Sequence, residues 1–219
     1  MRLAQVLGLS IFFAVATPVA AQTHSSSVGL NGGAVLFSSF NSGADAEVDL
    51  KPDIGFVGNA QYDWLVGSGH VGFRFAGHYQ QMQLDWSNGQ RKIYAWSGDF
   101  DLLLRPIRPN PDTRVIPFLS LGIGATHYNF GDGNPTSYEP SGALYDGEEK
   151  TQFSVLGGIA FDIVTGWAWD EGPFMIRIEA QDNYVLESPF KPIDGSADFG
   201  GVHNLRLTIG LHNSMGSLR

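Results

Sequence analysis

Apolar and polar residues alternate with a period of two along most of the chain beyond residue 22. In the clearest run, residues 204–211 read Asn-Leu-Arg-Leu-Thr-Ile-Gly-Leu. Successive side chains of a strand point to opposite faces, so this alternation predicts strands with one polar and one apolar face. Eight segments show it, some less regularly than others: 27–37, 53–65, 71–79, 94–105, 115–130, 151–166, 174–181 and 204–211. No stretch of helical period and useful length competes with them.

The links between these segments are of two kinds. The odd-numbered links are residues 38–52, 86–91, 131–150 and 188–202, and the even-numbered links are 67–69, 106–114 and 167–172. Apart from 86–91, the odd links are long and polar, while the even links are shorter. Outer-membrane barrels combine long external loops with short periplasmic turns. The links therefore predict an up-and-down barrel with both termini on the periplasmic side.

Alternation by itself does not say whether the apolar face points into the barrel or toward lipid. A soluble lipocalin-like calyx has its apolar face inside, whereas a transmembrane barrel has it outside. The polar faces here are rich in small and amide residues with scattered single charges, which suits a crowded interior better than a solvated surface. Large aromatic residues lie toward the ends of the apolar faces, as in interfacial girdles: Tyr62, Trp64, Tyr79, Tyr94, Trp96, Phe174 and Tyr184. We favour an all-β, eight-stranded, antiparallel, up-and-down transmembrane β-barrel over the calyx.

The first 21 residues have the features of a secretion signal. Arg2 supplies a positive start, an apolar run follows from Leu3 to Ala16, and small residues offer a cleavage point after Ala21. An uncleaved membrane anchor is the alternative, but the run is short and ends on small residues rather than on a charged flank. We predict a signal peptide over residues 1–21 and one barrel domain over residues 22–219.

Composition narrows the range of partners. Charged residues make up 16% of the chain, against about 25% in typical soluble domains. The net charge is −9 and the pI is near 4.9, and because phosphate binding needs clustered Lys and Arg, we expect no nucleic-acid partner. The chain has no cysteine, which excludes disulfides, thiolate metal sites, cysteine nucleophiles and a lipoprotein anchor.

One segment carries a family resemblance. Residues 116–125, Ile-Pro-Phe-Leu-Ser-Leu-Gly-Ile-Gly-Ala, look like the Pro–aromatic–alternating-glycine strand of the small OmpA, OmpX and opacity-type outer-membrane barrels. Together with the signal peptide, strand count and loop asymmetry, the resemblance covers essentially the whole mature chain. It implies a Gram-negative outer-membrane location among membrane lipids and lipopolysaccharide. We further expect a monomer without a cofactor, whose external loops are able to bind an extracellular ligand.

The end of the chain departs from the pattern of that family. Its members often finish on an aromatic residue that the insertion machinery reads, whereas here residues 212–219 follow the last apolar residue of the predicted strand, Leu211. The departure concerns the assembly signal and leaves the prediction of a barrel unchanged.

Eight charged residues lie on the polar faces and would point into such a barrel. They are Arg74, Asp99, Asp101, Arg105, Asp162, Arg177, Glu179 and Arg206. Four are basic and four are acidic, and buried charges must be paired and hydrogen-bonded to be tolerated. A selectivity filter or a proton path is one interpretation. We favour a structural network of ion pairs, because an eight-stranded barrel is just wide enough for its own side chains.

Candidate catalytic and metal-binding residues are few. His212 and Ser214 resemble the His-x-Ser element of a lipid A deacylase barrel, but they follow the last predicted strand on the periplasmic side, without an evident acidic partner. A hydroxyl nucleophile needs a positioned base and a residue that orients that base. No histidine spacing matches a metal motif. We therefore predict no catalytic, cofactor or metal site.

The predicted external loops are acidic. The first holds Asp45, Glu47 and Asp49, and the third holds Asp132, Glu139, Asp146, Glu148 and Glu149. Such carboxylates could bind divalent cations shared with lipopolysaccharide phosphates, but no spacing matches a calcium loop, and we favour a solvated loop face. The sequence thus predicts a non-enzymatic barrel for envelope integrity or surface interaction. A lipid A-modifying enzyme, a small-solute channel and a soluble binder are the alternatives.

Overall fold

A computed structural model describes residues 26–37, 40–41, 49–67, 69–86, 89–107, 113–129, 145–147, 150–169, 172–187, 190–192 and 201–215. The predicted signal peptide, residues 1–21, lies outside these residues. These residues include eight long strands: β1 (Ser26–Phe37), β4 (Gly55–Val66), β5 (Val71–Trp86), β6 (Gly89–Leu104), β7 (Val115–Asn129), β9 (Thr151–Trp169), β10 (Gly172–Val185) and β12 (Val202–Met215). Four short strands accompany them: β2 (Phe40–Asn41), β3 (Asp49–Pro52), β8 (Tyr145–Gly147) and β11 (Phe190–Pro192). Within the described ranges, no helix is long and apolar enough to cross a bilayer.

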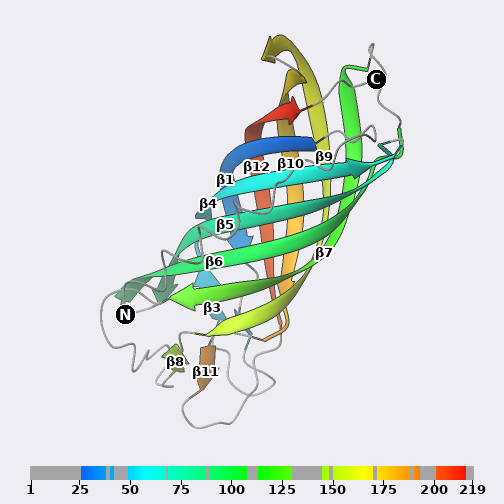
Figure 1. The fold of residues 1–219 in the computed structure, drawn as a ribbon. Helices are drawn as coiled ribbons and strands as arrows, with labels where there is room; N and C mark the ends of the chain where they lie inside the picture. The colour runs from blue at the N-terminus through cyan, green and yellow to red at the C-terminus, as the bar shows by residue number, and fades with distance from the viewer. Residues whose placement is uncertain are drawn as a thin grey trace, which may run out of the picture.

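The eight long strands form a closed antiparallel barrel (Figure 1). Each pairs with the next long strand in the chain, and β1 pairs with β12, which gives every long strand a partner on both sides. A circuit along the paired residues leaves β1 at Ser27 and returns to it ten residues further on, at Phe37. That offset is the stagger that tilts the strands against the barrel axis. The predicted eight-stranded, all-antiparallel fold is confirmed.

The apolar faces of the strands point outward and the polar faces point into the barrel. On β12, Leu205 and Leu207 are 38% and 43% exposed, whereas Arg206 between them is 1% exposed. The same alternation recurs on the other long strands. A barrel that exposes its apolar face and buries its polar face suits lipid and not water. The alternative of a soluble calyx is therefore wrong.

The two ends of the barrel differ. At one end, β4 and β5 are joined by a tight turn in which Gly67 and Gly69 have φ angles of 59° and 79°, a region that favours glycine. Ser26 and Met215 pair at this end, so the first strand begins and the last strand ends here. At the other end, β8 and β11 pair with each other and join two of the predicted external links (Figure 1). We assign the end that holds the Gly67–Gly69 turn and the Ser26–Met215 pair to the periplasm, because the long links lie at the other end.

Several predicted strands end too early, as β9 does, which reaches Trp169, and two further cases change a link or a candidate residue. β5 and β6 form a hairpin in which Trp86 pairs with Gly89, so the second external link is much shorter than the predicted 86–91. β12 continues to Met215, so His212 and Ser214 lie inside the last strand and not after it. In both cases backbone pairing continues beyond the alternating pattern, as at Asn213, which interrupts the apolar face of β12.

Candidate functional site

The candidate site is the interior of the barrel. All eight charged residues singled out from the sequence lie there, and each is 6% exposed or less: Arg74, Asp99, Asp101, Arg105, Asp162, Arg177, Glu179 and Arg206. Alternation on each strand explains their direction, because residues two apart share a face. Asp63 on β4 joins them as a fifth buried acid.

The first cluster of ion pairs lies toward the periplasmic end. Arg177 donates two parallel hydrogen bonds to Asp162, from Nε to Oδ1 at 2.7 Å and from Nη2 to Oδ2 at 2.9 Å. Its Nη1 is 2.7 Å from Oδ2 of Asp63. Arg74 donates from Nε to Oδ1 of Asp63 at 2.9 Å and from Nη1 to Glu179. Asp63 therefore lies between two guanidinium groups, which compensates the burial of its charge.

An aromatic ring supports the same two arginines. The guanidinium carbons of Arg177 and Arg74 are 4.5 and 5.1 Å from the centroid of the Phe118 ring on β7. At these distances the negative face of the ring attracts a desolvated cation. Phe118 belongs to the segment that carries the family resemblance, so its aromatic position now has a physical role inside the barrel.

A second cluster lies nearer the external end. Arg206 on β12 donates from Nη1 to Oδ2 of Asp99 at 2.8 Å and to Oε1 of Gln181 at 3.2 Å, and from Nη2 to Oγ of Ser97 at 2.9 Å. Nε2 of His78 is also 2.8 Å from Oδ2 of Asp99. One carboxylate thus faces a guanidinium and an imidazole.

The remaining two predicted residues lie at the margins of these clusters. Nη2 of Arg105 is 3.5 Å from Oδ2 of Asp162. Oδ2 of Asp101 accepts a hydrogen bond from Nε2 of Gln181 at 3.3 Å and is 3.8 Å from Nη1 of Arg74. Asp101 therefore connects the first cluster to the second.

The ion pairs join opposite walls of the barrel. In the closed order of eight long strands, β5 and β10 are four strands apart in either direction, and so are β6 and β12. The Arg74–Glu179 pair spans the first two walls, and the Arg206–Asp99 pair spans the second two. At these levels, side chains cross the whole width of the lumen.

Apolar side chains fill the lumen beyond the charges. Toward the external ends of the strands the inward positions, each 3% exposed or less, are Val35, Val57, Met82, Ile93, Ala95, Tyr128, Val185 and Val202. Toward the periplasmic end, Leu65, Leu103, Ile116 and Met175 occupy inward positions and are also buried. An apolar layer therefore lies between the paired charges and the external opening, whereas at the periplasmic end apolar residues share the inward positions with Ser27, His212, Ser214 and Arg105.

Comparisons with known proteins identify the fold. No family model and no curated protein matches the sequence. Among solved structures, the chain is similar to the outer membrane protein OprG from Pseudomonas aeruginosa, with 11% identity, a TM-score of 0.54 and coverage of 89% of this chain and 97% of that one. The chain has the fold of the small outer-membrane β-barrels.

Two other solved barrels match less well. Ail of Yersinia pestis, crystallised with the heparin analogue sucrose octasulfate, has a TM-score of 0.45 and 14% identity, over 87% of this chain and 99% of Ail. Neisserial surface protein A has a TM-score of 0.45 and 13% identity, over 89% of this chain and 98% of that one. With its apolar exterior, the fold places the chain in an outer membrane, which confirms the predicted location.

Sequence reasoning missed two charged or titratable members of the interior of this outer-membrane barrel. Asp63 lies between Tyr62 and Trp64, and His78 lies between Gly77 and Tyr79. Their positions on the polar faces were the available signal. The less regular alternation of β4 concealed Asp63, and a histidine on a polar face did not indicate burial.

The other candidate residues lie apart from the ion pairs or outside the described ranges. Nε2 of His212 is 2.9 Å from Oδ1 of Asn31, and Ser214 is buried on the same face of β12. In the part of the chain that is described, no three His, Asp or Glu residues are grouped to hold a metal ion. Asp45, Glu47, Asp132, Glu139, Glu148 and Glu149 lie outside the described residues.

Proposed function

We propose that this outer-membrane barrel is a sealed, non-enzymatic anchor that holds its long external links at the cell surface, for envelope integrity or for binding a surface partner. The observation that carries the proposal is the filled lumen, in which ion pairs cross between opposite walls below an apolar layer. In this proposal the interior charges are structural and stabilise the barrel from within.

Barrel size supports the absence of a channel. Eight strands enclose an interior that side chains can just fill, whereas open aqueous channels occur at roughly 16 strands. An ion that crossed this lumen would have to separate buried pairs such as Arg74–Glu179, and a separated buried charge is costly. The small-solute channel is therefore the less favoured alternative.

The environment of His212 and Ser214 supports a non-enzymatic role. A nucleophilic serine must reach its substrate and needs a base held in hydrogen-bond range. Here both residues are buried on the inner face of β12, and the imidazole of His212 faces Asn31. The Ser214 hydroxyl lies on the lumen side of the wall, away from lipid A acyl chains.

Conductance tests the proposal. Purified mature protein in planar bilayers is expected to give no steady conductance under conditions in which a known porin opens.

A double variant tests the absence of catalysis. His212→Ala combined with Ser214→Ala is expected to leave the lipid A acylation of an expressing cell unchanged, as measured by mass spectrometry. Porin-like steps from the purified monomer, or an acylation change that disappears in the double variant, would contradict the proposal.

A further inference from the structure

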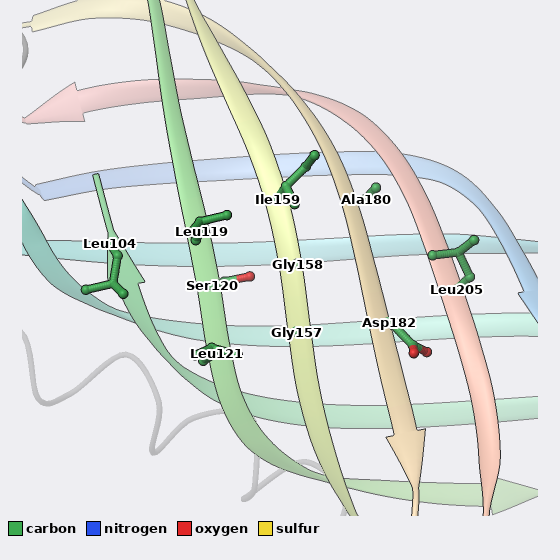
Figure 2. Close-up of a pocket in the computed structure, with 10 residues that line it drawn as sticks. All are labelled: Leu104, Leu119, Ser120, Leu121, Gly157, Gly158, Ile159, Ala180, Asp182 and Leu205. Carbon is green, nitrogen blue, oxygen red and sulfur yellow. The ribbon is translucent and has the colours of Figure 1, made fainter. Parts of the chain in front are cut away.

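An apolar groove lies on the lipid-facing wall of the barrel, where small residues replace large ones. It has a volume of about 350 Å³, and Gly157, Gly158 and Ala180 form its floor across β9 and β10. Leu119, Leu121, Ile159 and Leu205 stand around this floor, and Asp182 lies at one end (Figure 2). A Cβ atom added at Gly157 would meet only the Leu121 side chain, at 3.7 Å, so the space above this glycine is open.

The groove continues toward the centre of the bilayer. A second hollow of about 420 Å³ shares Ile159 and Ala180 with the first. Its other outward-facing members include Phe161, Ile178, Leu207 and Ile209, which are all apolar. The two hollows together form an elongated apolar groove along the outer wall, and this shape suits a hydrocarbon chain.

A polar pair marks the external end of this groove. Asp182 points outward from β10, and its Oδ2 is 2.7 Å from Nδ1 of the outward His203; 43% and 58% of the two side chains are exposed. The Tyr184 ring, 4.7 Å from the His203 ring, belongs to the interfacial aromatic residues. Asp182 precedes Tyr184 by two residues, so it lies about 5 Å nearer the bilayer centre for a tilted strand. A carboxylate is unusual at that depth on a lipid-facing surface.

We infer that this groove binds one acyl chain of lipid A, with the amide or hydroxyl groups at the base of the chain donating hydrogen bonds to Asp182. Asp182 is near the external end of β10, so the groove opens to the external leaflet. An ionised carboxylate only accepts hydrogen bonds and has more acceptor positions than the His203 contact uses. Amide-linked hydroxyacyl chains carry N–H and O–H donors just below the headgroup. Ester-linked phospholipid chains carry only acceptors there and do not complement Asp182.

The inference rests on the outer-membrane fold and not on the sealed lumen. A conducting barrel would leave it intact, and loss of lipid retention would leave the proposed anchor function intact. The two proposals therefore fail in different experiments.

Filling the groove tests the inference. Parent and variants are purified in mild detergent from the same lipopolysaccharide-containing outer membranes, and bound lipid A is counted by native mass spectrometry. Gly157→Leu fills the groove and is expected to reduce lipid A retention at least about fivefold. Gly98→Leu is the matched control, because Gly98 is an outward glycine of β6, outside the groove, with no atom within 4 Å of an added Cβ. Ala180→Leu is a second filling variant in case Gly157→Leu does not fold.

The role of Asp182 is tested separately. Asp182→Leu is expected to lower lipid A retention severalfold, and Asp182→Asn, which keeps one carbonyl acceptor, is expected to give intermediate retention.

A competition between lipids tests the choice of ligand. Protein in nanodiscs that hold equal amounts of lipid A and phosphatidylethanolamine is expected to retain lipid A after detergent washing. Equal retention by the groove-filling variants and Gly98→Leu would overturn the inference. Preferential retention of phosphatidylethanolamine would overturn it as well.

Discussion

At the scale of single residues, the interior depends on carboxylates that serve more than one cation. Asp63 accepts a hydrogen bond from Arg74 and faces Arg177, which come from different strands, β5 and β10. Phe118 lies beneath both guanidinium groups. Each member compensates the desolvation of the others, so loss of one member leaves a buried charge with less compensation than its burial requires.

Removal of Arg177 is expected to destabilise the barrel strongly. Arg177→Ala leaves Asp162 and Asp63 without their shared cation, and breaking a buried pair costs about 3–5 kcal/mol. Urea titration of the protein refolded into liposomes measures the effect. Arg114→Ala, at an exposed position beside β7, is the control and should change the midpoint little. Equal midpoints for the two variants would show that the interior pairs do not stabilise the fold.

The outward face can be tested with a single charge. Ile178 points to lipid from within β10. Its substitution by arginine is expected to lower the free energy of unfolding of the barrel by about 2–4 kcal/mol. Ile107 is also exposed but lies beyond the end of β6, where the cost of a charge is expected to be about 0–1 kcal/mol. Urea titration of Ile178→Arg and Ile107→Arg in liposomes gives the comparison. If both are tolerated equally, the assignment of a lipid-facing wall around Ile178 is wrong.

At the scale of the element, β7 shows why glycines alternate along a strand. Gly122 and Gly124 face inward beside Asp101 and Asp99 of β6. A Cβ atom at Gly122 would lie 2.0 Å from Oδ1 of Asp101 and 2.5 Å from the Phe100 carbonyl oxygen. The glycines of the segment that carries the resemblance therefore leave room for carboxylates of the neighbouring strand.

Gly122→Ala is expected to destabilise the barrel by about 1–3 kcal/mol, the usual cost of overpacking. A backbone oxygen is among the close contacts, so rotation of the Asp101 side chain does not relieve the crowding. Gly98→Ala, with nothing within 4 Å of the added Cβ, serves as the control. The measurement is the urea midpoint of both variants, and a Gly122→Ala midpoint equal to that of Gly98→Ala would refute the explanation.

At the scale of the whole molecule, residues far apart in sequence hold opposite walls together. Arg206 and Asp99 are 107 positions apart and lie on strands separated by half the barrel. Their contact exists only when the sheet is closed, because β6 and β12 do not pair with each other. The ion pairs and the closure of the barrel therefore stabilise each other.

A double-mutant cycle measures this coupling. Arg206→Ala and Asp99→Ala are each expected to destabilise the barrel, and the double variant is expected to lose less than the sum of both. Contacting residues typically show interaction energies of about 0.5–3 kcal/mol. The pair Arg206→Ala with Arg114→Ala is the additive control. Strict additivity for Arg206 and Asp99 would mean that the contact across the lumen contributes nothing.

The sequence by itself determined the strands and their faces. Alternation such as that of residues 204–211 is a local property, and each residue's direction follows from its parity along the strand. The eight predicted charges could therefore be assigned to the polar faces before any contact was known. Rim positions such as the Trp86–Gly89 hairpin were missed because pairing there continues where the alternation weakens.

Tertiary structure decided which residues meet. The ten-residue offset around the barrel sets which residues share a level, so it brings Arg74 to Glu179 and not to another acid. The lipid-facing groove likewise exists because β9 and β10 are adjacent, and their register pairs Gly157 with Asp182 and Ile159 with Ala180, which makes Gly157 and Ala180 diagonal neighbours on the outer face. Such contacts depend on register and closure, which are properties of the assembled sheet and are not visible in the period of any one strand.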